Sequence, residues 1–251
     1  MNPERIVCWE ALAPEDPVLL EARRLYETTQ APDEQIPWEW IGSAAAKRHS
    51  WRPGRWSPHL LLAAPLLNGD IGPLAGFAYG AHIPGFGGYV CYLGVDPAAR
   101  QRGVATRLFG QMFRVLAVDA GAEGTELPFI LWESHRPGAA APEEEWKLWG
   151  ARLRLFERVG AYWVEGIDFQ SPNFHDPAGP PIPLQLFLKP WDRPAEAFDA
   201  ASLRAIAAGL HRNVYRNGPG DPLFDRTFPP GCAPRLRPAR EAERPRPAVV
   251  A

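Results

Sequence analysis

The residues best suited to chemistry lie between positions 95 and 109, where the sequence reads VDPAARQRGVATRLF. An Arg-Gln-Arg run at 100–102 stands directly before Gly103, and an apolar helical pattern begins at Val104. A glycine before a helix lets the backbone approach a ligand closely, because no Cβ intervenes. The N–H groups of a first helical turn favour anions, and arginine side chains add donors that match phosphate oxygens. The stretch therefore predicts a cradle for a pyrophosphate.

Two common phosphate-binding motifs do not fit this stretch. It lacks the Gly-Lys-Ser/Thr of a P-loop, and it lacks the G-x-G-x-x-G of a dinucleotide-binding fold. Both classes of nucleotide-binding protein are therefore set aside.

The stretch instead resembles the signature of the GNAT acyltransferase superfamily, [RQ]-x-x-G-x-[GA] after a strand that ends in V-x-P. Here Val95, Asp96 and Pro97 are followed by Arg-Gln-Arg-Gly-Val-Ala at residues 100–105. The resemblance extends over roughly residues 3–190, because the elements expected there follow the family's order. It implies an α+β fold, with a mixed, mostly antiparallel central sheet and helices on both faces.

By that resemblance the protein uses an acyl-CoA, most simply acetyl-CoA, as co-substrate. The pantetheine arm would pair with the backbone of Leu93, Gly94 and Val95, and the backbone N–H groups of residues 102–106 would hold the pyrophosphate. A close approach would suit Gly94 in an otherwise apolar strand, although a bulge or packing relief would also explain it. The implied coenzyme-binding residues are Leu93, Gly94, Val95, Arg100, Gln101, Arg102, Gly103, Val104, Ala105 and Thr106.

The second half of the expected site departs from the family's pattern. Many members carry an Asn and, seven residues later, a Tyr that protonates the leaving thiolate. In WGARLRLFERVGA these positions hold Trp149 and Phe156. Phenylalanine has no proton to donate, so another group or solvent protonates the thiolate, or this chain is not an efficient acyltransferase.

Glu133, near the end of the apolar strand LPFILWES, is the best candidate for a catalytic base. A carboxylate that borders an apolar strand is expected to have a raised pKa, which suits the removal of a proton from an ammonium group. The alternative is a rim residue paired with a nearby arginine. Weaker candidates are Glu39, Tyr92 and Asp168.

Three functions stay open at this stage. The first is an acyl-CoA-dependent N-acyltransferase, in which a small-molecule or peptide amine attacks the thioester directly in a ternary complex. The second is a binding or regulatory module without catalysis, and the third is an O-acyltransferase. The six histidines show no HxH or HxxxH spacing, so no metal is expected.

The elements that must position these residues follow from the periodicity of apolar side chains. Residues up to 190 predict the order β-α-α-β-β-β-α-β-α-β-β, which constitutes the acyltransferase domain at 1–190. A helix at about 196–216 is expected in an extension over 191–232, followed by a solvated Pro/Arg-rich tail at 233–251. The helix carries an apolar stripe that would dock on the main body or on a partner subunit, which leaves a homodimer open.

Composition narrows the partners and the compartment. A formal net charge of −2 gives no reason to expect nucleic acid or a membrane surface as partner. Cys8, Cys91 and Cys232 have no CxxC spacing, which favours a reducing compartment. There is no apolar N-terminal signal and no long apolar run, so we expect a cytoplasmic location.

Overall fold

The computed structural model describes residues 5–138 and 140–242. The chain divides into two compact units. The first unit comprises residues up to 130 together with 174–177, and the second comprises 131–173 and the residues from 178 onward.

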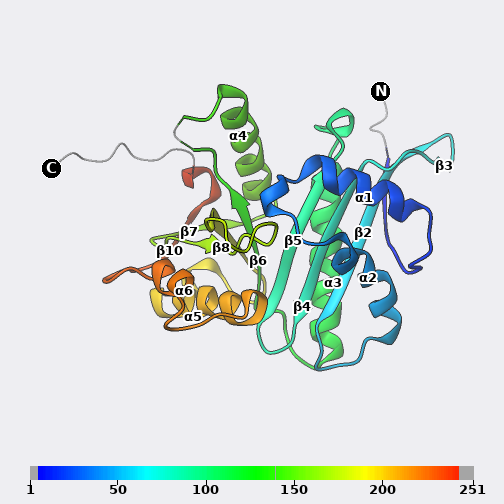
Figure 1. Ribbon diagram of the computed structural model, residues 1–251. Coiled ribbons are helices and arrows are strands. Elements are labelled where there is room, and N and C mark those ends of the chain that lie inside the picture. The colour runs from blue at the N-terminus through cyan, green and yellow to red at the C-terminus, as the bar shows by residue number, and fades with distance from the viewer. Residues whose placement is uncertain (1–4, 139, 243–251) are drawn as a thin grey trace. The chain divides into compact units, whose positions relative to one another are not determined.

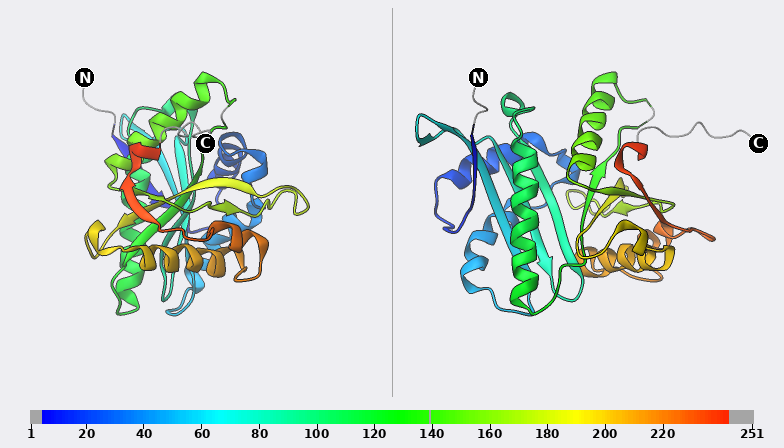
Figure 2. Two further views of the ribbon diagram at one scale, coloured as in Figure 1. Left: turned by 90° about the vertical axis from the view of Figure 1, so that its left-hand side faces the viewer. Right: turned by 180° about the vertical axis from the view of Figure 1, so that it is seen from behind.

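The first unit contains an antiparallel sheet with the strand order β1-β2-β4-β5 (Figure 1). Its strands are β1 Ile6–Glu10, β2 Ser57–Leu67, β4 Gly76–Ile83 and β5 Gly87–Val95, and the short β3 Asp70–Ile71 pairs with β2. Its longer helices are α1 Val18–Thr29, α2 Trp38–Ser50 and α3 Val104–Ala122. Seen from behind, α3 lies across the strands on the face opposite to α1 and α2 (Figure 2). The sheet of this unit is therefore covered on both faces.

Helix α3 forms because its apolar residues recur at helical spacing and all face the sheet. The buried apolar residues of this stripe are Val104, Leu108, Phe109, Met112, Phe113 and Leu116. The helix ends at Ala122, and its last turns include the buried Asp119.

The second unit contains the strand order β6-β9-β7-β10, and β8 pairs with β9. The strands are β6 Phe129–His135, which starts at the end of the first unit, β7 Tyr162–Glu165, β8 Gln170–Ser171, β9 Ile182–Pro190 and β10 Arg235–Pro238. The helices are α4 Glu143–Arg158, α5 Ala200–Leu210, a π-helix at His211–Tyr215 and α6 Pro222–Thr227.

The predicted fold class is confirmed: the chain combines helices with a largely antiparallel sheet, and helices follow in the C-terminal region. The predicted single helix at 196–216 is wrong in detail. Asp199 accepts a hydrogen bond from the backbone N–H of Ser202 at 2.7 Å, so α5 begins only at Ala200. The helix then widens into the π-helix and ends at Arg216, which has a left-handed φ of 61°.

The apolar stripe of α5 is buried within the single chain, as its residues Leu203, Ile206, Ala207 and Leu210 show. Residues 235–242, which were expected in a solvated tail, form β10 and a short 3-10 turn instead. Arg235 and Arg237 lie 2.5 and 3.2 Å from Glu165 Oε2, and the bond from Arg235 lowers the pKa of Glu165. Residues 243–251 of the expected tail lie outside the described residues.

In the part of the chain that the structure describes, no helix is both long enough and apolar enough to cross a bilayer.

Candidate functional site

The turn before α3 adopts the conformation that its sequence requires. The carboxylate of Asp96 accepts the N–H of Ala98 at 2.8 Å and caps a short 3-10 turn, Pro97–Ala99. Gln101 and Gly103 then have positive φ angles of 64° and 83°, and α3 begins at the next residue. A left-handed φ favours glycine, so the backbone itself explains Gly103.

The helix start beyond this turn is open. A Cβ added to Gly103 would meet no atom within 4 Å, so packing does not require the glycine. No side chain of the described residues caps this end, and the first helical bond runs from Arg107 N to Gly103 O at 3.0 Å. The N–H groups before Arg107 therefore have no partner inside the helix and can bind an anion.

Two arginines precede Gly103 in this turn. Arg100, Gln101 and Arg102 are all exposed, whereas Val104 is buried and anchors the first turn of the helix in the core. These residues fit the pyrophosphate of coenzyme A, because they combine backbone donors with guanidinium groups around a glycine. Ligand binding by Leu93–Val95 and residues 100–106 stays a prediction.

Gly94 has a different explanation from Gly103. A Cβ on Gly94 would lie 2.4 Å from Phe77 Cε1 and 2.4 Å from Thr29 Oγ1. Packing alone therefore requires this glycine, as the alternative interpretation allowed. The neighbouring carbonyl of Leu93 accepts a hydrogen bond from Gln30 Nε2 at 3.4 Å, so the side chain of Gln30 borders the expected pantetheine strand.

Glu133 lies on β6 and is half-buried. Its Oε1 accepts a hydrogen bond from the hydroxyl of Tyr215, the last residue of the π-helix. This partner could not be predicted from the sequence, because Tyr215 is 82 positions away and lies in a π-helix that no local sequence signal indicates.

The ring of Tyr215 is held by two aromatic neighbours. It packs edge-on against His211 with ring centroids 5.6 Å apart, and tilted against Phe169 at 6.1 Å. His211 is buried, and its two ring nitrogens lie 2.9 Å from Asn217 Oδ1 and 2.9 Å from Thr227 Oγ1. Burial lowers the pKa of His211, so this ring is neutral at neutral pH.

The two positions that depart from the family's pattern belong to an aromatic core in the second unit. Trp149 is 1% exposed and Phe156 is 6% exposed. The ring of Phe156 lies 4.7 Å from that of Phe187 and 5.4 Å from that of Trp132, between centroids. Both residues therefore serve packing, which agrees with the absence of a catalytic acid at Phe156.

The weaker candidates have separate surroundings. The hydroxyl of Tyr92 donates to the Glu34 carbonyl at 2.6 Å, and burial raises the pKa of Tyr92. Glu39 is exposed in the first turn of α2, and Asp168 accepts a hydrogen bond from Gln170 Nε2 at 3.2 Å. Within residues 5–138 and 140–242, no three His, Cys, Asp or Glu side chains are grouped so as to hold a metal.

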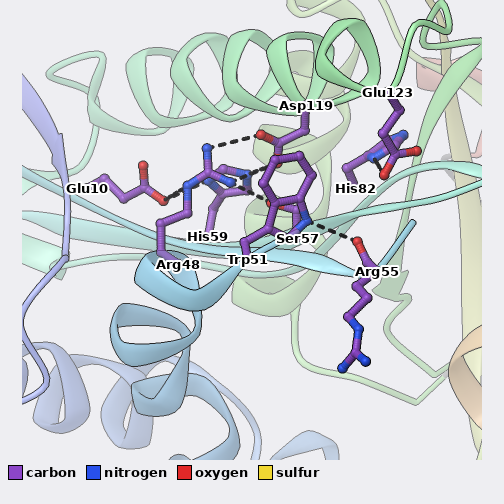
Figure 3. Close-up of polar contacts among 9 residues, drawn as sticks. All are labelled: Glu10, Arg48, Trp51, Arg55, Ser57, His59, His82, Asp119 and Glu123. Carbon is purple, nitrogen blue, oxygen red and sulfur yellow. Dashed lines mark hydrogen bonds and ion pairs between the residues drawn. The ribbon is translucent and has the colours of Figure 1, made fainter. Parts of the chain in front are cut away.

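A buried ion network lies elsewhere in the first unit, between β1, β2, α2 and α3 (Figure 3). His59 is fully buried, with Nδ1 at 2.7 Å from Glu10 Oε1 and Nε2 at 2.7 Å from Asp119 Oδ2. Arg48 donates to Asp119 Oδ1 at 3.0 Å and to Ser57 Oγ at 2.6 Å. Burial alone would lower the pKa of His59, but the bonds to Asp119 and Glu10 outweigh it and raise the pKa.

A second buried histidine is found beside this network. His82 is 3% exposed, and its Nδ1 lies 3.9 Å from Glu123 Oε1, which also accepts the N–H of Gly54 at 3.0 Å. Burial lowers the pKa of His82. Both histidines are buried, and because both ring nitrogens of His59 lie against carboxylates, we assign His59 to the stability of the first unit.

Known proteins resemble this chain in sequence and in fold. Residues 20–127 match the model of the acetyltransferase (GNAT) family, which covers the open turn and α3. This region of the chain is therefore a GNAT acetyltransferase-family domain, as the signature at 100–105 implied. A search of curated protein sequences gave no significant match.

Among solved structures, one supports the same fold. A Bacteroides thetaiotaomicron protein assigned to the GNAT family of acetyltransferases matches with a TM-score of 0.51 and 19% identity, over 83% of this chain and 98% of its own. The ribosomal-protein-S18-alanine N-acetyltransferase of Escherichia coli matches with a TM-score of 0.44 and 14% identity, over 76% and 97%. At these identities the likeness concerns the fold alone.

Proposed function

We propose that this protein is an acyl-CoA-dependent N-acyltransferase that transfers an acetyl group from acetyl-CoA to a small-molecule or peptide amine. The observation that supports it best is the open start of α3. There a glycine at a φ of 83° lies inside the region that matches the acetyltransferase family. The signature residues thus have a backbone conformation that suits an anion.

In this proposal the coenzyme is a substrate whose two halves are bound differently. The N–H groups of residues 102–106 hold the pyrophosphate, and Arg100 and Arg102 donate to its oxygens. The backbone of Leu93, Gly94 and Val95 holds the pantetheine arm. The resemblance to the GNAT superfamily supports this division.

The chemistry is a direct transfer without an acyl-enzyme. The neutral amine nitrogen attacks the thioester carbonyl carbon, the C–S bond breaks, the nitrogen releases its second proton to solvent to form the amide, and coenzyme A leaves as a thiolate that takes up a proton. The attacking ammonium must first lose a proton, and Glu133 is the proposed base. With Phe156 in the core, solvent or another group supplies the proton for the thiolate.

Thiol release is the measurement that tests this function. Purified protein is mixed with acetyl-CoA and a panel of primary amines, and free coenzyme A is followed with a thiol reagent. Amine-dependent release supports the proposal. Release only with alcohols would point to O-acylation, and binding of acetyl-CoA without any release would indicate a binding module.

The role of Glu133 is tested by the substitution Glu133→Gln, which keeps the shape and removes the base. We expect kcat to fall by about 10²–10⁴-fold, the usual range for loss of a general base, with the affinity for acetyl-CoA unchanged. Glu165→Gln is the matched control, because that carboxylate pairs with Arg235 instead. Full turnover in Glu133→Gln would reduce Glu133 to a rim residue.

A further inference from the structure

Glu133 and Tyr215 meet although they come from distant parts of the sequence. Glu133 belongs to β6, whereas Tyr215 ends the π-helix that follows α5 in the C-terminal region. The phenol hydroxyl of Tyr215 donates its hydrogen bond to Oε1 of the carboxylate. A segment beyond residue 190 thus supplies a partner to the residue proposed as the base.

The position of the phenol is set by packing rather than by this bond alone. Its ring contacts His211 and Phe169, and both nitrogens of His211 are themselves within 2.9 Å of hydrogen-bonding partners. The next residue, Arg216, has a φ of 61°, a conformation that a non-glycine residue adopts at a cost. Short π-helical segments of this kind are frequent at functional sites.

A phenol donor has a definite effect on a carboxylate. A hydrogen bond donated to the ionised form favours that form, and a general base must be ionised before it can accept a proton. The bond also fixes the rotation of the carboxyl group, so that the second oxygen keeps one direction. Because the phenol is neutral, it lowers the pKa of the carboxyl group less than a cationic partner would.

We propose that Tyr215 is the positioning residue for Glu133, and that the C-terminal extension thereby completes the acyl-transfer machinery. Tyr215 acts through the carboxylate and keeps it ionised and oriented. This inference rests on the proposed function, in which Glu133 is the base.

The first test needs neither coenzyme nor turnover. The side-chain carboxyl of Glu133 is titrated by NMR in protein labelled with ¹³C-glutamate, with Glu133→Gln used to assign the signal. In Tyr215→Phe, which keeps the ring contacts and removes the hydroxyl, we expect the titration midpoint to move to higher pH by about one pH unit. Tyr162→Phe on β7 is the matched control and should leave the midpoint unchanged.

The second test uses the full chain with acetyl-CoA and an accepted amine. In Tyr215→Phe we expect kcat to fall by about tenfold with KM for acetyl-CoA unchanged, because one charge-assisted hydrogen bond is lost. The acidic limb of kcat/KM should move to higher pH with the titration of Glu133. In a Glu133→Gln background the same substitution should have no further effect on kcat.

The outcomes separate the two claims. An active wild type, with unchanged titration and pH profile in Tyr215→Phe, would overturn the positioning role and leave the proposed function intact. No turnover in the wild type, with the titration shift present, would overturn the proposed function and reduce the pair to a structural contact. Melting curves of each variant show whether the substitution leaves the fold in place.

Discussion

Helix α3 begins at an open turn and ends beside a buried ion network, and both ends belong to the first unit. At the start, Gly103 is exposed and exposed arginines precede it. Near the end, Asp119 is 1% exposed and is bonded to both His59 and Arg48. The exposed arginines before the first end are accessible to a ligand. At the second end, the carboxylate of Asp119 is bonded to side chains of the protein instead.

The two ends of α3 are therefore expected to have different roles, ligand binding at the start and stability of the fold near the end. Open N–H groups and exposed guanidinium groups hold an anion but contribute little to folding. A buried charge that loses its partner instead destabilises the fold strongly. Substitutions near Gly103 should therefore change affinity for coenzyme A, and substitutions near Asp119 should change the free energy of unfolding.

The largest effect is expected for Asp119→Ala. Removing this carboxylate leaves the buried His59 and the partly buried Arg48 without their shared partner, which should lower the free energy of unfolding by about 3–5 kcal/mol. Urea denaturation measures the change. Asp70→Ala, at an exposed site on β3, is the control and should stay within about 0.5 kcal/mol. An equally small change at Asp119 would contradict the structural role of the network.

The next effect tests the other end of the helix. Gly103→Asp and Gly103→Asn place side chains of the same shape at a left-handed φ, which both residues tolerate better than most, so their folding costs should be similar. Only Asp adds a negative charge beside the phosphates. We expect Asp to abolish the thermal stabilisation by coenzyme A, and Asn to weaken it. Identical behaviour of the two variants would argue against a bound anion.

A pH titration tests the ion network without a large structural change. Because the pKa of His59 is raised in the folded state, its proton stabilises the fold fully below the unfolded value of 6.5. That stability is lost as the pH rises through the higher folded value. His82 and His211 have lowered pKa values, so they affect stability only as the pH falls.

The expected observation is a free energy of unfolding that decreases above pH 6.5 in the wild type. In His59→Gln that decrease should disappear, because no titrating group remains between Glu10 and Asp119. Chemical denaturation at several pH values from 6 upward makes the comparison. A wild-type curve that is flat over this range would show that the pKa of His59 is not raised in the folded protein.

The smallest effect is expected for Arg102→Ala. An exposed guanidinium contributes about 0.2–1 kcal/mol to an ion pair, so the affinity for coenzyme A should fall by a factor of about 1.4 to 5. Arg114→Ala, further along the same helix, is the control and should leave the affinity unchanged. Calorimetric titration of both variants resolves the difference, and an equal loss in both would indicate nonspecific attraction.

Local sequence was enough to predict the open turn, since the residues that form it are consecutive. The apolar stripe of α3 likewise marks its face without knowledge of the rest of the chain. The buried network could not be predicted, because Arg48 and Asp119 are 71 positions apart and only the fold brings them together. The contact of Tyr215 with Glu133 could not be predicted for the same reason, because it depends on a helix end that departs from regular geometry.

The two glycines of the signature region show what a sequence motif can and cannot predict. Gly94 and Gly103 both lie in the signature region, and sequence alone suggested that each allows a ligand to approach. The structure separates them, because Phe77 and Thr29 would contact a Cβ at Gly94 whereas no atom would contact one at Gly103. Gly94 is therefore required by packing, whereas Gly103 is favoured by its φ of 83° and leaves space in which a ligand can approach.

Thermal melting of the wild type with coenzyme A tests the central claim most directly. At a ligand concentration of about 100 times Kd, binding should stabilise the protein by about 2.7 kcal/mol. For a chain of this size, that corresponds to an increase in Tm of about 5–11 °C. If neither coenzyme A nor acetyl-CoA raises the Tm, even at millimolar concentration, the account is contradicted. The protein would then have an acetyltransferase fold that does not bind this substrate.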